Sequence, residues 1–326
     1  MAAMAALRIE HFDRTHLDGA AALLADRHRA QREHEPGLDP RYEDMAATRP
    51  EIEALLDLDG ASGVAAHREG RLLGYLIGVV RDEAVWGPNV WVEVAGHAAV
   101  DTEIARELYA VAAAGWVEAG RTNHHVVVPA TDPALVDAWF RLDFGQQHVH
   151  AIRETPSADW QPTARDGIAI RRAERRDIPA LAEIDLALPR HHLGSPVFSR
   201  LPVPTVDEAV ADLEEDFGDE RSATFVALLD GAIVGSAVGC SIELSSMHVG
   251  LARPASAGFL GFAAILPEAR GHGVGRALGG TVIAWSRDAG YPWVMTDWRS
   301  TNVQASRAWT ALGFRPLFRR LHRSIL

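Results

Sequence analysis

The chain has 326 residues, of which 48% are hydrophobic and 23% are charged, and its formal net charge is −12. This length exceeds one ordinary α/β domain and suits two domains of roughly 150 residues each. The negative charge argues against a nucleic-acid partner, because nucleic-acid binders concentrate cations, and it suits either a cationic substrate or mere solubility.

Cys240 is the only cysteine in the sequence. This excludes an intrachain disulfide framework and a cysteine-based zinc site, and it fits a reducing compartment. The sequence contains no lysine, which excludes Schiff-base chemistry. Residues 1–7 lack the parts of a signal peptide, and no apolar run approaches the roughly 20 residues of a membrane span. We therefore expect a soluble, cytoplasmic protein with no membrane association.

In the first half, a strand at Leu7 to Glu10 is expected to lead into a helix. Gly70 to Gly78 (GRLLGYLIG) is one of the β-rich segments with glycine turns that follow, and a strand, a helix, a strand, a helix and a last strand come after them. The most charged stretch, residues 27–44, is expected to be a solvated helix and loop, with a cover over a pocket as the alternative.

Residues 154–167 are polar, contain two prolines and show no period, as expected of a linker. The same element order then starts again with a strand at Ile168 to Arg171, and GAIVGSAVG at Gly231 to Gly239 resembles the segment at Gly70 to Gly78. The sequence thus predicts a first domain at 1–155, a linker at 156–167 and a second domain at 168–326.

An internal repeat supports this division. Residues 106–153 align without a gap with residues 276–323, and Trp139 matches Trp309 at a spacing of 170 positions. Chance rarely keeps one offset through a helix, a strand, a helix and a strand. We predict two tandem α+β domains, each a mixed, mostly antiparallel sheet flanked by helices.

The segment at 258–290 has the clearest chemical signal. Phe259 to Leu266 is an apolar run typical of a strand buried on both faces, and Pro267 ends it. Arg270 to Gly275 (RGHGVG) then forms a glycine-rich turn that opens a helix, which Gly290 closes. Successive backbone N–H groups and the helix dipole make such a turn an anion site, although a tight turn without a ligand remains the alternative.

Other phosphate motifs fit this turn less well. The Rossmann spacing fails because Arg276 stands at the position of its third glycine, and a P-loop fails because no Gly-Lys-Ser/Thr follows.

These residues resemble the GNAT superfamily of N-acyltransferases, whose coenzyme A loop reads Gln/Arg-x-x-Gly-x-Gly/Ala. Arg270 to Gly275 matches that loop in full, and Asn302, Ala305, Trp309 and Leu312 to Phe314 match the family's second mark. The match covers residues 168–326, with a weaker extension over 1–155.

The resemblance implies that acetyl-CoA lies between the splayed fourth and fifth strands and that an amine attacks the thioester directly. A backbone N–H near Ala264 or Ile265 would support the oxyanion. The implied coenzyme-binding residues are Ala264, Ile265, Leu266, Arg270, Gly271, His272, Gly273, Val274, Gly275, Arg276, Asn302 and Trp309.

Asp297 is the candidate general base, because its position resembles that of a catalytic glutamate in ribosomal-protein acetyltransferases. A carboxylate satisfied by neighbouring N–H groups is the alternative. Trp309 replaces the family's usual tyrosine, so Ser306 or water is expected to hydrogen-bond the leaving thiolate. Three polar residues are candidates for the acceptor site: Glu243, His248 and His192.

The first half has lost these features. The offset of 170 places Asp101 and Glu103 where the second half has Gly271 and Gly273, and carboxylates repel a pyrophosphate. We therefore expect one coenzyme site per chain.

The paired histidines do not indicate a metal site. Adjacent residues on a strand point to opposite faces, and neither His124-His125 nor His191-His192 is accompanied by HExxH or HxH spacing. No metal is expected.

The sequence predicts an acetyl-CoA-dependent N-acetyltransferase that acts on a primary amine of a small molecule in a ternary complex. Mycothiol synthase, which shares the tandem architecture, and antibiotic-modifying enzymes fit this description. A protein or peptide N-acetyltransferase and a non-catalytic acyl-CoA sensor remain open. Either a monomer, as an internal pseudo-dimer, or a homodimer is expected.

Overall fold

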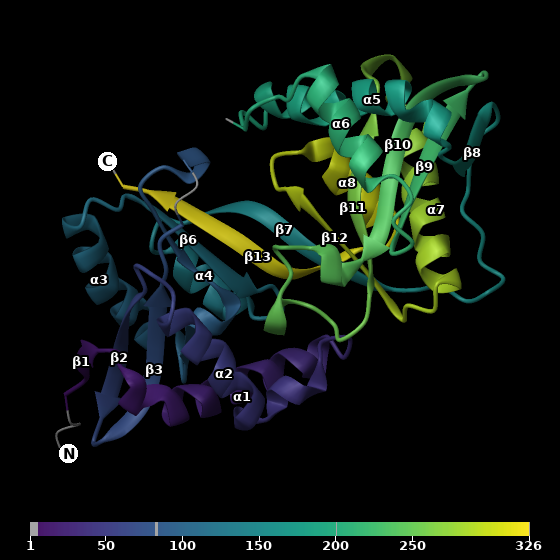
Figure 1. Ribbon diagram of the computed structural model, residues 1–326. Coiled ribbons are helices and arrows are strands. Elements are labelled where there is room, and N and C mark those ends of the chain that lie inside the picture. The colour runs from purple at the N-terminus through teal and green to yellow at the C-terminus, as the bar shows by residue number, and fades with distance from the viewer. Residues whose placement is uncertain (1–5, 82–83, 200, 326) are drawn as a thin grey trace. The chain divides into compact units, whose positions relative to one another are not determined.

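A computed structural model describes residues 6–81, 84–199 and 201–325 (Figure 1). Within these ranges the chain forms two compact units. The first unit takes in residues 1–148, 250–253 and 317–326, and the second takes in residues 149–249 and 254–316.

Helices and strands of the first unit follow one another in the order expected for the first repeat. They are β1 (Arg8–His11), η1 (Arg14–His16), α1 (Leu17–His34), η2 (Pro40–Glu43), α2 (Met45–Leu56), β2 (Ser62–Arg68), β3 (Arg71–Gly78), η3 (Ala84–Trp86), β4 (Asn89–Val92), η4 (Val94–Gly96), β5 (His97–Ala99), α3 (Thr102–Glu118), β6 (Asn123–Pro129), α4 (Pro133–Phe140) and η7 (Gly250–Ala252). Strands β7 (Gly145–Glu154) and β13 (Arg315–Ser324) each divide between the two units.

The second unit repeats this order. Its remaining elements are β8 (Ile168–Arg172), η5 (Arg175–Asp177), α5 (Ile178–Leu193), α6 (Val206–Asp216), β9 (Ser222–Leu229), β10 (Ala232–Ser241), η6 (Ile242–Leu244), β11 (Gly258–Ile265), η8 (Pro267–Ala269), α7 (Val274–Asp288), β12 (Trp293–Arg299) and α8 (Val303–Ala311).

In the first unit, the strands pair in the order β1-β2-β3-β5, all antiparallel, while β4 is parallel to β6 and β6 is antiparallel to β13. Leu108 and Trp116 of α3 pack with Trp139 and Phe144 in one apolar core. Leu321, from the last strand of the chain, belongs to this core as well.

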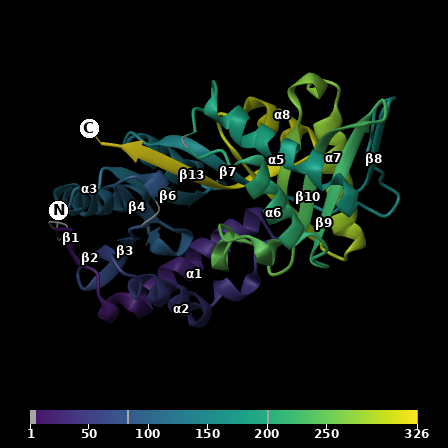
Figure 2. The same ribbon diagram turned by 45° about the horizontal axis from the view of Figure 1, so that its top comes forward.

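In the second unit the strand order is β12-β11-β10-β9-β8, with β11 parallel to β12 and the other pairs antiparallel. Successive residues of β9 face opposite sides. Phe225 packs in the core that contains Leu278 of α7, and Val226 packs against Leu181 of α5. Helices α5 and α7 thus cover opposite faces of this sheet (Figure 2).

The observed elements confirm the predicted α+β fold in two copies. Both ends of β6 and β7 lie 170 positions before the corresponding ends of β12 and β13. In the early part of each copy, η1 and η5 are 161 positions apart. The two halves therefore share most of this order, but the first half has two short strands, β4 and β5, where the second half has the single strand β11.

The compact units do not follow a single cut in the sequence. Most of the last strand, residues 317–324, groups with the N-terminal segments, and residues 149–155 group with the C-terminal ones. Among the described residues, no helix is long and apolar enough to cross a membrane.

Candidate active site

The sheet of the second unit opens between β11 and β12. These parallel strands pair only at Gly258, Phe259 and Leu260, which lie opposite residues 294–296. From Gly261 onward β11 continues to Ile265 without a partner on β12. The two strands therefore splay apart toward their carboxyl ends, as the resemblance to the GNAT superfamily implied.

The glycine-rich turn leads from the open end of β11 into α7. Gly271 has a φ of +82° and Gly273 a φ of +91°, in the left-handed region that favours glycine. A Cβ atom on Gly275 would lie 3.1 Å from the side chain of Ile265. The turn therefore needs glycine for its backbone shape and for its close approach to the strand.

The start of α7 offers unused hydrogen-bond donors. Gly273 is the N-cap residue, and no side chain caps the helix there. Within the described ranges, no backbone or side-chain oxygen accepts a hydrogen bond from the amides of residues 271–275. These N–H groups and the positive end of the helix dipole make an anion site, since the first N–H groups of a helix have no partner inside it.

A narrow cavity of about 90 Å³ lies in the opening between the strands. Six predicted coenzyme-binding residues line it, together with residues of α5 and α8. Its lining comprises Ala187, Leu188, His191, Ala263, Ala264, Ile265, Arg270, Gly275, Asn302, Gln304, Ala305, Ala308 and Trp309.

A second hollow, of about 320 Å³, lies on the other side of the turn, beside Gly273. Three arginines line it: Arg153, Arg165 and Arg276. The guanidinium of Arg153 lies 5.8 Å from the ring centre of Trp160, and burial lowers its pKa, as does the nearby charge of Arg315. Of this cationic wall, formed by the three arginines, the sequence predicted only Arg276 as coenzyme-binding, and it missed Arg165 because it assigned residues 156–167 only the role of a linker.

Asp297 stands on β12 immediately after the last residue that pairs with β11. Its side chain is 18% exposed, and its Oδ2 lies 3.8 Å from Nε2 of the fully buried His248. Nδ1 of His248 lies 2.7 Å from the hydroxyl oxygen of Ser245. In the tautomer that carries its proton on Nε2, His248 accepts from Ser245 and turns its N–H toward the carboxylate.

Asn302 links α8 to the end of α5. Its Oδ1 accepts a hydrogen bond from the Ala305 amide at 3.1 Å, and its Nδ2 lies 3.3 Å from Nε2 of His192. The neighbouring His191 lines the cavity, and its pKa is lowered first by burial and then by the charge of Arg270. His191 is therefore largely neutral near pH 7.

Trp309 packs closely against α7. A Cβ atom on Gly279 would approach its ring to 2.6 Å, so the absence of a side chain there is what admits the indole. Trp309 is 7% exposed. It therefore forms a wall of the cavity and a part of the core at the same time.

Other predicted site residues do not line either hollow. Ser306 lies on α8 between two lining residues, and Glu243 is exposed on η6. Leu266 precedes η8 and donates its N–H to the Val234 carbonyl at 2.9 Å, and the ring of His272 contacts carbonyls of its own turn.

The corresponding place in the first unit is built differently. Asp101 is the N-cap of α3, and its side chain accepts the Ile104 amide at 2.9 Å. At this helix end a carboxylate therefore already accepts the hydrogen bond of an amide that would otherwise face a phosphate. A hollow of about 330 Å³ beside it is lined by Arg27 of α1, which is partly buried and donates to the carbonyls of Val94 and His97. The sequence predicts a solvated helix and loop for residues 27–44, and this prediction is wrong for Arg27, because its guanidinium lies inside the unit.

Comparisons with known proteins find acetyltransferases. The acetyltransferase (GNAT) family model matches residues 191–314. The chain is 37% identical over 112 residues to an aminoglycoside N(6')-acetyltransferase type 1 of Stenotrophomonas maltophilia. These 112 residues are 34% of this chain and 71% of that protein.

Two solved structures are similar over nearly the whole chain. A GCN5-related N-acetyltransferase from Sphaerobacter thermophilus is 15% identical, with a TM-score of 0.60 over 98% of this chain and 95% of that one. A tandem GNAT protein from the clavulanic acid biosynthesis pathway is 15% identical, with a TM-score of 0.50 over 98% of each chain. At these identities the likeness concerns the fold.

Proposed function

The chain belongs to the acetyltransferase (GNAT) family, and from that premise we propose that its second unit transfers an acetyl group from acetyl-CoA to a primary amine of a small molecule. The chain is an acyltransferase by this membership.

One observation carries the proposal most directly. The uncapped, glycine-rich start of α7 and the opening between β11 and β12 border the same cavity. An anion held at the helix start and an acyl group placed between the strands can therefore belong to one extended molecule. Acetyl-CoA has this form, with its pyrophosphate and its thioester at the two ends of a flexible arm.

The cationic wall would hold the rest of the coenzyme. Acetyl-CoA carries a further phosphate on its ribose, and Arg153, Arg165 and Arg276 line a hollow on the far side of Gly273. Arginine binds phosphate in two-pronged geometry. We assign this hollow to the nucleotide end of the coenzyme.

Strand geometry selects the donor for the oxyanion. The Leu266 amide donates to Val234 on β10, and amides alternate between the two sides of a strand. The Ala264 amide then also points to β10, whereas the amides of Ala263 and Ile265 face the opening. Of the two residues that the sequence suggested, Ile265 is the one whose N–H would support the tetrahedral intermediate.

Asp297 would take the proton of the amine. It lies where the strands part, and Nε2 of the buried His248 lies 3.8 Å from its carboxylate. Water would protonate the departing thiolate, because Trp309 carries no acidic proton near neutral pH and Ser306 does not line the cavity.

The acceptor class rests on two observations. The relative from Stenotrophomonas maltophilia is named as an aminoglycoside acetyltransferase, and aminoglycosides are cationic amines. The chain itself has a net charge of −12, which attracts cationic acceptors at low salt. We therefore propose a small cationic amine as the acceptor and, from the single cysteine, a cytoplasmic location.

A thiol-release assay tests the proposal. The chain would be mixed with acetyl-CoA and a panel of amines, with free coenzyme A measured by a thiol reagent and the acetylated product by mass spectrometry. Cationic small amines should release thiol in the wild type and not in Gly273→Glu. Coenzyme binding without turnover on any amine or peptide would indicate a sensor, and turnover on peptides alone would indicate a protein acetyltransferase.

A further inference from the structure

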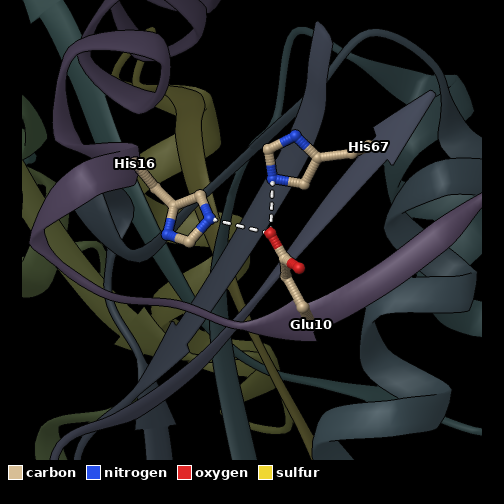
Figure 3. A group of neighbouring side chains, drawn as sticks. All are labelled: Glu10, His16 and His67. Carbon is tan, nitrogen blue, oxygen red and sulfur yellow. Dashed lines mark hydrogen bonds and ion pairs between the residues drawn. The ribbon is translucent and has the colours of Figure 1, made fainter. Parts of the chain in front are cut away.

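Three side chains that are distant in the sequence converge in the first unit (Figure 3). Glu10 lies on β1, His16 on η1 and His67 on β2. Strands β1 and β2 are antiparallel with Arg8 opposite His67, so Glu10 is a diagonal neighbour of His67 on the same face. Figure 3 shows both imidazole rings turned toward the Glu10 carboxylate.

The distances in this cluster suit a shared ion. Oε1 of Glu10 lies 3.3 Å from Nε2 of His16 and 3.5 Å from Nε2 of His67, and the three ligand atoms lie within 4.8 Å of one another. Good N–H···O hydrogen bonds are shorter, near 2.9 Å. Two ligands at about 2.0–2.1 Å from a tetrahedral zinc ion lie about 3.3 Å apart. The spacing thus matches the edge of a coordination tetrahedron.

The surrounding residues hold this arrangement in place. Oδ1 of Asp13 lies 3.0 Å from Nδ1 of His16. Nδ1 also accepts a hydrogen bond from the Asp13 backbone amide at 3.0 Å, as part of the cap of η1. With Nε2 bound to a metal, the ring proton would have to move to Nδ1, where the Asp13 carboxylate can accept it. Arg8 pairs with Oε2 of Glu10 at 2.7 Å, which leaves Oε1 directed at the two rings.

Exposure permits an ion to enter. The side chains of Glu10, His16 and His67 are 33%, 9% and 20% exposed. A fourth position can therefore be taken by water, and the Nε2 atoms can exchange their protons with solvent as the ion binds.

The second unit shows what these positions become without metal ligands. The offset of 161 between η1 and η5 places Arg171, Asp177 and Leu228 at the sites of Glu10, His16 and His67. Arg171 and Asp177 form a two-pronged ion pair at 2.6 and 2.9 Å. Both halves thus tie the first strand to the turn before the first long helix, and only the first half does so with two histidines and a carboxylate.

We propose that Glu10, His16 and His67 bind one divalent transition-metal ion of the zinc type. Two imidazole nitrogens and a carboxylate oxygen are the donor set that zinc takes when a fourth position is left to water. The ion joins β1, η1 and β2, and it stabilises the start of α1 against the sheet. The sequence predicted no metal because these residues do not form a local spacing motif. The site does not depend on the proposed acetyl transfer.

Metal binding is tested on the full chain without a polyhistidine tag, after dialysis against a chelator. Zinc should bind by calorimetry with one equivalent and raise Tm by about 3 °C or more, because a ligand of the folded state stabilises it. Cobalt(II) should give the intense visible absorption of four-coordinate cobalt, which six-coordinate surface binding does not give.

Matched variants locate the site. Glu10→Gln and His67→Gln should each lose the cobalt absorption and the zinc-dependent rise in Tm. His11→Gln, on the same strand but facing the other side, should keep both. If either Glu10→Gln or His67→Gln fails to fold, the other variant still tests the metal site. No zinc or cobalt binding by the wild type would leave an ion pair only, and unchanged binding in both variants would place the metal elsewhere; either result overturns the proposal.

Discussion

A charge placed at the start of α7 should remove coenzyme binding, and Gly273 is the residue at which the effect can be worked out. Its φ of +91° is costly for any other residue, by about 1–2 kcal/mol. A Cβ atom there would meet only the Arg165 side chain at 3.4 Å or more, which is ordinary contact. Gly273→Ala should therefore lower stability by roughly 1 kcal/mol and weaken acetyl-CoA binding only a few-fold.

Gly273→Glu adds a negative charge to the same strain. At about 5 Å from a phosphate and an effective dielectric constant of about 20, the repulsion is about 3 kcal/mol per phosphate charge. This corresponds to a loss of affinity greater than 100-fold relative to Gly273→Ala. Because salt screens the repulsion, the gap between the two variants should narrow as ionic strength rises.

Calorimetric titration of acetyl-CoA into the wild type and both variants, at two salt concentrations, measures this difference. Thermal melts would show that each variant is folded. If Gly273→Glu binds acetyl-CoA within three-fold of Gly273→Ala at low salt, the turn does not hold the pyrophosphate and the placement of the coenzyme is wrong.

Three further changes test separate parts of the account. Asp297→Asn should lower kcat/KM by about 100-fold, as expected for a lost general base, with unchanged acetyl-CoA affinity; near-normal turnover would remove Asp297 from the role of base. Trp309→Phe should keep most of kcat, because the indole packs against Gly279 and carries no acidic proton; a folded variant that binds acetyl-CoA but has lost turnover would contradict this. Asp185 lies on α5, and burial raises its pKa to about 6. The folded state therefore binds this proton more tightly than the unfolded state does. The stability that the protonated carboxyl adds at low pH is lost as the pH rises from about 4 through 6. Asp185→Asn should therefore come close to the wild type in urea unfolding near pH 4 and exceed it by about 3 kcal/mol at pH 8. Equal stability at both pH values would show that burial does not raise the pKa of Asp185.

The fold could be predicted from the sequence because its signals are local or periodic. The offset of 170 positions carried strand and helix boundaries from one half to the other, so β6 and β12 begin and end at matching residues. The glycines of the turn were found because a positive φ and close packing demand that residue type.

The rest of the site depends on contacts between residues that are far apart in the sequence. Arg165 has no motif of its own, and only the path of the chain after β7 brings it beside Gly273. His248 and Asp297 are likewise brought together by two different segments. The composition of residues 27–44 predicts a solvated stretch, yet Arg27 lies on the inner side of α1, where its two terminal nitrogens donate to backbone carbonyls.

The central claim is that one half of the chain holds the coenzyme and the other half has lost it, and the stoichiometry of acetyl-CoA binding tests this most directly. Calorimetry on the wild-type chain should give one equivalent per chain, because α7 has an uncapped glycine start and α3 is capped by Asp101. Two equivalents, or one equivalent that persists undiminished in Gly273→Glu, would contradict it.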